Sequence, residues 1–185
     1  MHLSFDELPL EGLKRVRRQP IADERGVFCR FYCSEEFGLA GTRKPIAQIN
    51  HTLTRRRGAV RGLHFQHPPH AETKIVSCIA GAVFDVAVDL RRGSPSFLKW
   101  HAEILSAENR LGMLLPEGFA HGFQALEPDS ELIYLHTTAY VPDAEDALHA
   151  SDPRLAIAWP LPIAELSERD SSHPFLEADW PGISP

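Results

Sequence analysis

Nine short runs of apolar or alternating residues, separated by turn-forming segments, dominate the chain between residues 27 and 140. Each run is six to ten residues long, and several alternate apolar and polar side chains as a half-buried strand does. Only residues 34–41 indicate a helical turn, which Gly41 would end. Many short strands in succession predict an all-β sandwich or barrel, of which the jelly roll is one common form. The runs cover residues 27–33, 47–54, 59–65, 74–80, 82–90, 97–105, 110–115, 118–126 and 131–140.

The run at residues 82–90 shows this alternation most clearly. One of its faces is wholly apolar, so we expect that face to be turned toward the core. The apolar face holds Phe84, Val86, Val88 and Leu90, and the other face holds Val83, Asp85, Ala87 and Asp89.

Length and composition indicate one globular domain over residues 1–185. A net charge of −6 does not favour a nucleic-acid-binding surface. No apolar run approaches the roughly 18 residues that cross a bilayer, and charged residues near the start of the chain occupy the place of a signal peptide's apolar core. Three cysteines without a CxxC pair argue against a disulfide framework, so we expect a cytoplasmic protein. The proline-rich tail after Trp159 is expected to pack as short helical turns.

A polar stretch at residues 61–66, Arg-Gly-Leu-His-Phe-Gln, is the first candidate for chemistry. In an extended strand His64 and Gln66 share one face, whereas Arg61 starts on the other. Gly62 can bend the strand and free Arg61 to point elsewhere. A polar outer face would account for these residues as simply as a cavity wall would. A second histidine stretch in the same small barrel favours the cavity.

That second stretch, residues 116–121, reads Pro-Glu-Gly-Phe-Ala-His and fits the later of the two cupin motifs. The earlier motif needs two histidines, and here Gln66 stands in place of the second. His64, Glu72 and His121 could still form a two-histidine, one-carboxylate metal site. Lys74 would place a cation beside that metal and oppose its binding.

Two further groups of residues have no fixed role on their own. Tyr134 and Tyr140 either bury area and form one hydrogen bond each, or one of them serves as a general acid in a pocket with a histidine opposite. Residues 167–170, Ser-Glu-Arg-Asp, read as a charged surface turn.

Taken together, these motifs resemble those of the dTDP-4-dehydrorhamnose 3,5-epimerases and their relatives that act on nucleotide-linked 4-keto-6-deoxy sugars. The resemblance extends over nearly the whole chain, and its strength lies in the order of the motifs. They fall at residues 23–28, 48–50, 61–66, 85–95, 105–109, 116–123, 134–142, 152–160 and 167–170. The resemblance implies a cupin-type jelly roll with a few short helices, mostly near the C-terminus. It also implies a homodimer with exchanged N-terminal strands.

The resemblance assigns four catalytic residues. His64 matches the base, and Asp170 matches the carboxylate that orients it. Lys74 matches the cation beside the C4 oxygen of the sugar, and Tyr134 matches the acid on the opposite face. The chemistry requires these types, because a histidine with an ordinary pKa of about 6.5 cannot remove a proton next to a ketone unless a cation stabilises the enolate. No metal or organic cofactor is implied, since the substrate's own ketone accepts the electrons.

The resemblance also implies substrate-binding roles. Arg25 and Arg61 match groups that hold the diphosphate through paired hydrogen bonds. Gln48 and Asn50 match polar residues near the nucleotide and sugar, and His121 matches a polar pocket residue. Tyr140 is added as a binding residue from the tyrosine-rich motif.

Three departures from the family pattern bear on the substrate. Arg30 stands where many relatives have a glutamate, residues 149–151 differ from the usual Trp-Asn, and Arg169 replaces a lysine. The nucleotide base and the exact sugar therefore stay open. Members of the family invert either C3 and C5 or one carbon alone, so a single-centre epimerase is an alternative. A metal-dependent cupin enzyme and a sugar-binding cupin without turnover are the others.

Overall fold

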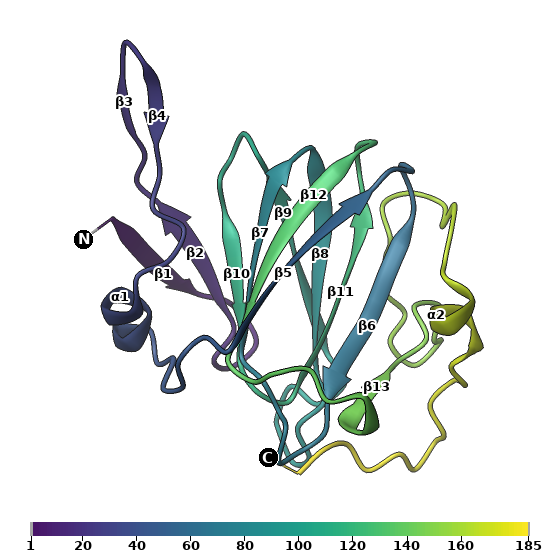
Figure 1. Ribbon diagram of the computed structural model, residues 1–185. Coiled ribbons are helices and arrows are strands. Elements are labelled where there is room, and N and C mark those ends of the chain that lie inside the picture. The colour runs from purple at the N-terminus through teal and green to yellow at the C-terminus, as the bar shows by residue number, and fades with distance from the viewer. Residues whose placement is uncertain (1, 185) are drawn as a thin grey trace.

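Two antiparallel β-sheets face each other in the computed structural model, which describes residues 2–184 (Figure 1). The six-stranded sheet runs in the order β1 (Leu3–Glu7), β2 (Lys14–Arg18), β10 (Gly112–Leu115), β7 (Lys74–Ala80), β12 (Ser130–His136) and β5 (Gln48–Thr54). The five-stranded sheet runs β13 (Glu145–Ala147), β6 (Val60–Gln66), β11 (Phe119–Ala125), β8 (Ala82–Asp89) and β9 (Trp100–Ser106). The predicted all-β sandwich is confirmed.

The remaining elements are short. β3 (Ile21–Asp23) and β4 (Gly26–Phe28) form a separate ribbon that projects from the sandwich in Figure 1. The helices are α1 (Ser34–Leu39), a single 3₁₀ turn at Pro142–Ala144, and α2 (Glu168–Ser172). Helix α1 coincides with the predicted helical turn, and the tail after Trp159 contains one helix, α2. Within residues 2–184 no helix is both long and apolar enough to cross a membrane.

Eight of the nine predicted runs each coincide with one strand, from β5 to β12. The prediction for residues 27–33 was wrong beyond Phe28, because the chain leaves the β3–β4 ribbon there and Cys33 begins α1 as its N-cap. The ring of Phe31 lies 4.6 Å from the guanidinium of Arg18 instead of packing in a sheet. Strands β1 and β2 were missed because their charged side chains pair across the strands, as Arg17 does with Asp6, and hide the apolar alternation.

The core between the sheets receives side chains from both. Its buried members include Val76 and Cys78 of β7, Met113 of β10, Leu132 and Tyr134 of β12, Val83 and Ala87 of β8, Leu105 of β9, and Phe119 and Phe123 of β11. Tyr134 belongs to this core and also lines the cavity described in the next subsection, so the cavity adjoins the core.

The wholly apolar face of β8 is buried in a hydrophobic cluster, as predicted, but it does not face the core between the sheets. This face points outward, where Val86 and Val88 pack against residues 148–183 of the C-terminal segment. The face with Val83 and Ala87 lines the core between the sheets. Because the C-terminal segment covers the outer face, both faces of β8 are buried, and apolarity alone cannot tell them apart. Asp85 is thereby carried into the interior.

Asp89, at the end of β8, is a buried carboxylate held by Arg91 and by the hydroxyls of Ser94 and Ser96. Burial opposes its charge, but these hydrogen bonds outweigh burial and lower the pKa of Asp89 to about 2. The folded state therefore gains stability from this group above the ordinary carboxyl pKa and loses it as pH falls toward 2.

We expect Asp89→Asn to reduce the free energy of unfolding by about 2 kcal/mol at pH 7, since one pKa unit is worth about 1.4 kcal/mol. The difference from the wild type should shrink to about 1 kcal/mol at pH 3. Urea unfolding followed by circular dichroism at both pH values measures this. A difference that does not change between pH 7 and pH 3 would contradict the assignment.

Candidate active site

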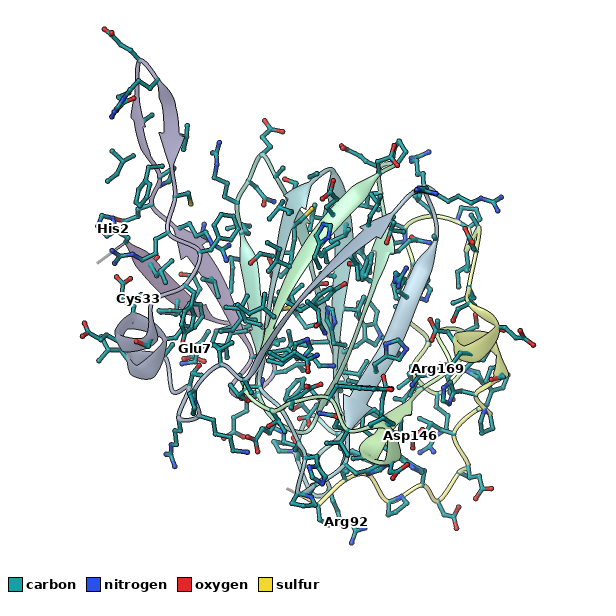
Figure 2. All side chains as sticks on the ribbon, viewed as in Figure 1. His2, Glu7, Cys33, Arg92, Asp146 and Arg169 are labelled. Atoms are coloured by element: carbon teal, nitrogen blue, oxygen red, sulfur yellow. The ribbon has the colours of Figure 1, made fainter. Side chains whose placement is uncertain are left out.

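A cavity of about 240 Å³ lies between the two sheets, with walls from β5, β6, β7, β11 and β12. Side chains fill the space between the two sheets around this cavity (Figure 2). Of the ten predicted site residues, eight line this cavity: Gln48, Asn50, Arg61, His64, Lys74, His121, Tyr134 and Tyr140. Asp170 lies behind His64 and reaches it by a hydrogen bond, and Arg25 is elsewhere.

A bulge in β6 explains how Arg61 and His64 both reach the cavity. His64 pairs with His121 of β11 and Arg61 pairs with Phe123, so one more residue lies between the pairs on β6 than on β11. Gly62 sits in this bulge with φ of +108°. A Cβ there would lie 2.6 Å from the Cα of Gly122, so the close approach of the two strands requires glycine.

His64 is held by a carboxylate from the far end of the chain. Its Nε2 lies 2.8 Å from Oδ1 of Asp170, and the backbone N–H of Gly62 donates to the other oxygen at 3.3 Å. Ser167 caps α2 by accepting from the backbone N–H of Asp170, which fixes the turn. Burial opposes the charge of Asp170, but the hydrogen bond from His64 outweighs it and lowers the pKa of Asp170.

This contact defines the tautomer of neutral His64. An ionised carboxylate only accepts hydrogen bonds, so Nε2 carries the proton. The lone pair of a neutral imidazole then lies on Nδ1. His64 can therefore accept a proton through Nδ1 while Asp170 stabilises the cation that forms.

Tyr134 lies on the opposite wall. It belongs to β12 of the six-stranded sheet, whereas His64 belongs to β6 of the five-stranded sheet. Its hydroxyl lies 3.1 Å from Oγ1 of Thr52, and its side chain is 8% exposed. Burial raises the pKa of Tyr134 well above the ordinary value, so the phenol keeps its proton at neutral pH. A group that can accept a proton and a group that can donate one thus face each other.

Lys74 supplies a buried cation beside His64. Its ammonium donates to the backbone carbonyl of His64 at 2.9 Å and lies 3.0 Å from Oε1 of Glu72. Its side chain is 8% exposed. The ammonium is therefore fixed beside the backbone of the candidate base.

The polar residues of β5 lie together at one side of the cavity. The amide of Gln48 donates to Asn50 at 3.0 Å and accepts from the backbone N–H of Tyr140 at 3.0 Å. The hydroxyl of Tyr140 donates to Glu145 at 2.6 Å. Deeper in, Nε2 of His121 lies 2.7 Å from the fully buried Asp85, whose pKa burial raises.

Arg25 does not line this cavity. It lies in the turn of the β3–β4 ribbon, where its side chain is 89% exposed and pairs with Asp23 (Figure 1). Within a single chain Arg25 therefore lies apart from the other predicted site residues, and its role at the diphosphate stays a prediction.

Sequence reasoning missed several residues of the cavity. Thr52 and His136 lie two positions from Asn50 and Tyr134 on the same strands, so alternation could have found them. Asp85 was placed on a face that was expected to point away from the core. Glu72 was considered only as a metal ligand. It lies two positions from Lys74, but its contact with His136 joins residues that are 64 positions apart.

The residues suggested for a metal site do not fit one. His64 is bound to Asp170, His121 to Asp85, and Glu72 to Lys74 and His136. Among the described residues no group of three or more His, Cys, Asp or Glu side chains is arranged to hold a metal ion. The arrangement instead suits proton transfer at two faces of a small molecule.

The fold and the site define a jelly-roll enzyme of the isomerase class, and comparison with known proteins places it more closely. The sequence model of the dTDP-4-dehydrorhamnose 3,5-epimerase family matches residues 7–178. The chain belongs to this family.

Individual relatives agree with this assignment. The 3,5-epimerase of Pseudomonas aeruginosa is 45% identical over 160 residues, which are 85% of this chain and 87% of the relative. A dTDP-4-dehydrorhamnose 3-epimerase of Streptomyces niveus is 41% identical over 180 residues, with coverage of 96% and 86%. The crystal structure of a Legionella pneumophila 3,5-epimerase with dTDP-4-keto-L-rhamnose superimposes with a TM-score of 0.91, at 35% identity and full coverage of both chains.

Proposed function

We propose that the protein converts dTDP-4-dehydro-6-deoxyglucose to dTDP-4-dehydro-L-rhamnose by inverting C3 and C5. The observation that carries this proposal is the position of His64 and Tyr134 on facing walls of one cavity. Inversion of a carbon requires that a proton leave one face and another arrive at the opposite face, so the two groups must flank the sugar.

In the first step His64 removes the proton from the carbon next to the C4 ketone. The C–H bond breaks, and its electron pair moves through a new C–C double bond onto the ketone oxygen to form an enolate. The ammonium of Lys74 stabilises the charge that develops on this oxygen. Asp170 holds His64 in the tautomer that accepts the proton.

In the second step Tyr134 donates its proton to the same carbon from the opposite face, and the carbonyl forms again. Tyr134 then regains a proton from solvent and His64 releases one, so the reaction is an isomerisation without oxidation or reduction. The same sequence at the other carbon adjacent to the ketone completes the double inversion. The ketone of the substrate accepts the electrons in both rounds.

A group of arginines beside the cavity supports a diphosphate-bearing substrate. A second opening of about 540 Å³ shares Arg61 and His64 with the cavity and adds Arg55, Arg56 and Arg169. Figure 2 shows Arg169 on α2, which packs against β6. Guanidinium groups bind phosphate oxygens through paired hydrogen bonds. We propose that Arg61 and its neighbours hold the diphosphate, and that Gln48 and Asn50 contact the sugar or nucleotide.

We further propose a cytoplasmic homodimer in which the N-terminal strands of one subunit cross to the other. The β3–β4 ribbon exposes large apolar side chains, with Ile21 at 54%, Val27 at 52% and Phe28 at 64%. Such a patch on an isolated ribbon is typical of a surface that a partner covers. Arg25, in the turn of this ribbon, would then reach the diphosphate in the partner's cavity.

Phe28→Asp tests this arrangement. A buried charge at the subunit contact should convert the dimer to a monomer and raise the KM, because Arg25 would be withdrawn with the ribbon. Sedimentation velocity and steady-state kinetics measure the two effects. A variant that stays dimeric with an unchanged KM would contradict the proposal, and Ile104→Asp, at an exposed apolar residue of β9, is the matched control.

A proton NMR time course in deuterium oxide with dTDP-4-keto-6-deoxyglucose tests the activity. The proposal predicts that deuterium enters at C3 and C5 and that treatment of the protein with a chelator changes nothing. Entry at one carbon alone would identify a single-centre epimerase instead. A requirement for added metal, or no exchange at all, would contradict the proposed chemistry.

A further inference from the structure

The environment of Lys74 contains a carboxylate that the proposed mechanism does not use. Glu72 precedes β7 and lies in the wall of the cavity, with its side chain 8% exposed. A negative charge 3.0 Å from the ammonium weakens the field that Lys74 can offer to an enolate. By its charge alone, Glu72 would therefore weaken the stabilisation of the enolate, so we looked at what its contacts do for Lys74.

Both oxygens of Glu72 are engaged. Oε1 contacts the ammonium of Lys74, while Oε2 lies 2.9 Å from Nδ1 of His136 and accepts from the amide of Gln66 at 3.3 Å. Burial opposes the charge of Glu72, but the hydrogen bond from His136 and the charge of Lys74 outweigh it and lower its pKa. The carboxylate is thus ionised at neutral pH and held from three sides.

The ammonium of Lys74 has three hydrogens to donate. The ammonium donates to the carbonyl of His64 at 2.9 Å and forms an ion pair with Glu72 at 3.0 Å. A lysine side chain is long and flexible, so without fixed acceptors its charge would move among several rotamers. With two acceptors in place, the third hydrogen is left for a ligand in the cavity.

We propose that Glu72, held by His136, is a positioning residue that fixes the ammonium of Lys74 against the C4 oxygen of the substrate. This inference rests on the proposed function and adds to it two residues that the family resemblance did not assign. Glu72 acts through geometry, and His136 and Gln66 draw part of its charge away from Lys74.

Variants of Glu72 separate geometry from charge. We expect Glu72→Ala to lower kcat about 30- to 100-fold with a change in KM of less than about threefold, because a displacement of about 1 Å of a catalytic group costs up to 10²-fold. Glu72→Gln keeps an acceptor oxygen and should restore kcat to within about fivefold of the wild type. His136→Ala should lower kcat less than Glu72→Ala, and His136→Asn, which keeps a donor, should restore it.

The double variant Lys74→Ala/Glu72→Ala gives the decisive comparison. If Glu72 acts through Lys74, its removal should change kcat by less than about twofold when Lys74 is already absent. The control is Glu131→Ala on β12, which breaks an exposed pair with His51 and should leave kcat unchanged. Multiplicative losses in the double variant, or a Glu72→Gln variant as impaired as Glu72→Ala, would overturn the proposal.

A measurement that needs no turnover keeps this inference distinct from the proposed function. The chain has only four lysines, Lys14, Lys44, Lys74 and Lys99, so the ammonium signals of ¹⁵N-lysine-labelled protein can be assigned with Lys74→Ala. The signal of Lys74 should be protected from exchange in the wild type and lost in Glu72→Ala. Persistence of the signal in Glu72→Ala would overturn the inference. A dependent signal in a protein that does not turn over would support the positioning and contradict the proposed substrate.

Discussion

Replacement of His64 by alanine is expected to lower kcat by about 10³- to 10⁴-fold and to abolish deuterium entry from solvent. A proton next to a ketone leaves only when a base lies within reach. Of the two imidazoles that the five-stranded sheet presents to the cavity, that of His64 is 31% exposed and that of His121 only 6%. Asp170 cannot take over, because it lies on the Nε2 side of the ring and its lowered pKa makes it a weak base. The KM should change little, since binding rests on other residues.

The control for this experiment is His51→Ala. His51 lies on β5 and pairs with Glu131 at the surface, 2.7 Å away. It should keep full activity, which would show that loss of a histidine is not in itself harmful. A His64→Ala variant with more than about a tenth of the wild-type rate would rule out His64 as the base. The kcat of Asp170→Asn should fall between those of His64→Ala and His51→Ala, because an amide can hold His64 in the wrong tautomer.

Tyr134→Phe is expected to separate the two half-reactions. Removal of the hydroxyl should reduce product formation by about 10²- to 10⁴-fold, because the proton for the second face is lost. Proton removal by His64 should continue, so recovered substrate should carry deuterium without inversion. Mass and proton NMR analysis of substrate and product measures both quantities in one sample.

The raised pKa of Tyr134 sets the alkaline behaviour of the wild type. Its acid form is the active one, and burial keeps this form populated above the ordinary tyrosine pKa of about 10. Ionisation of Tyr134 should therefore cause no loss of rate between pH 8 and pH 10.

The control for the Tyr134→Phe experiment is Tyr32→Phe, at a ring that stacks on Phe37 outside the cavity. Equal loss of exchange and inversion in Tyr134→Phe would contradict a role as the second-face acid.

Local pattern predicted most of the strands, because alternation and turn residues are properties of neighbouring positions. It failed where distant segments decide the outcome. The outward face of β8 is covered by Leu155 and Ile183, so its apolarity did not indicate the direction of the core. Strands β1 and β2 carry charges such as Arg15 and Asp6 that are neutralised only when the strands meet.

In the candidate site, too, local pattern predicted the strand positions of residues but not how distant segments come together. Alternation places Lys74 and Tyr134 on their strands, but it does not assign those strands to sheets. The separation of His64 and Tyr134 onto facing walls depends on pairings between β6 and β11 and between β12 and β7. Asp170 lies 106 residues from its partner His64, and only the ordered resemblance to the epimerases connected the two. Alternation could have placed His136 near Tyr134, but neither alternation nor the resemblance connected His136 with Glu72.

The segment after β13 does two things at once. It buries the outer face of β8 through Leu148, Leu155 and Ile183, and through α2 it delivers Asp170 to His64. Backbone hydrogen bonds also tie this segment to the five-stranded sheet, from the N–H of Val60 to the carbonyl of Glu165 and from the N–H of Leu148 to the carbonyl of Leu63. Removal of the segment would therefore expose the apolar outer face of β8 and take the carboxylate away from His64 at the same time. The apolar contacts of the tail thus hold the candidate catalytic pair together as well as covering the sheet.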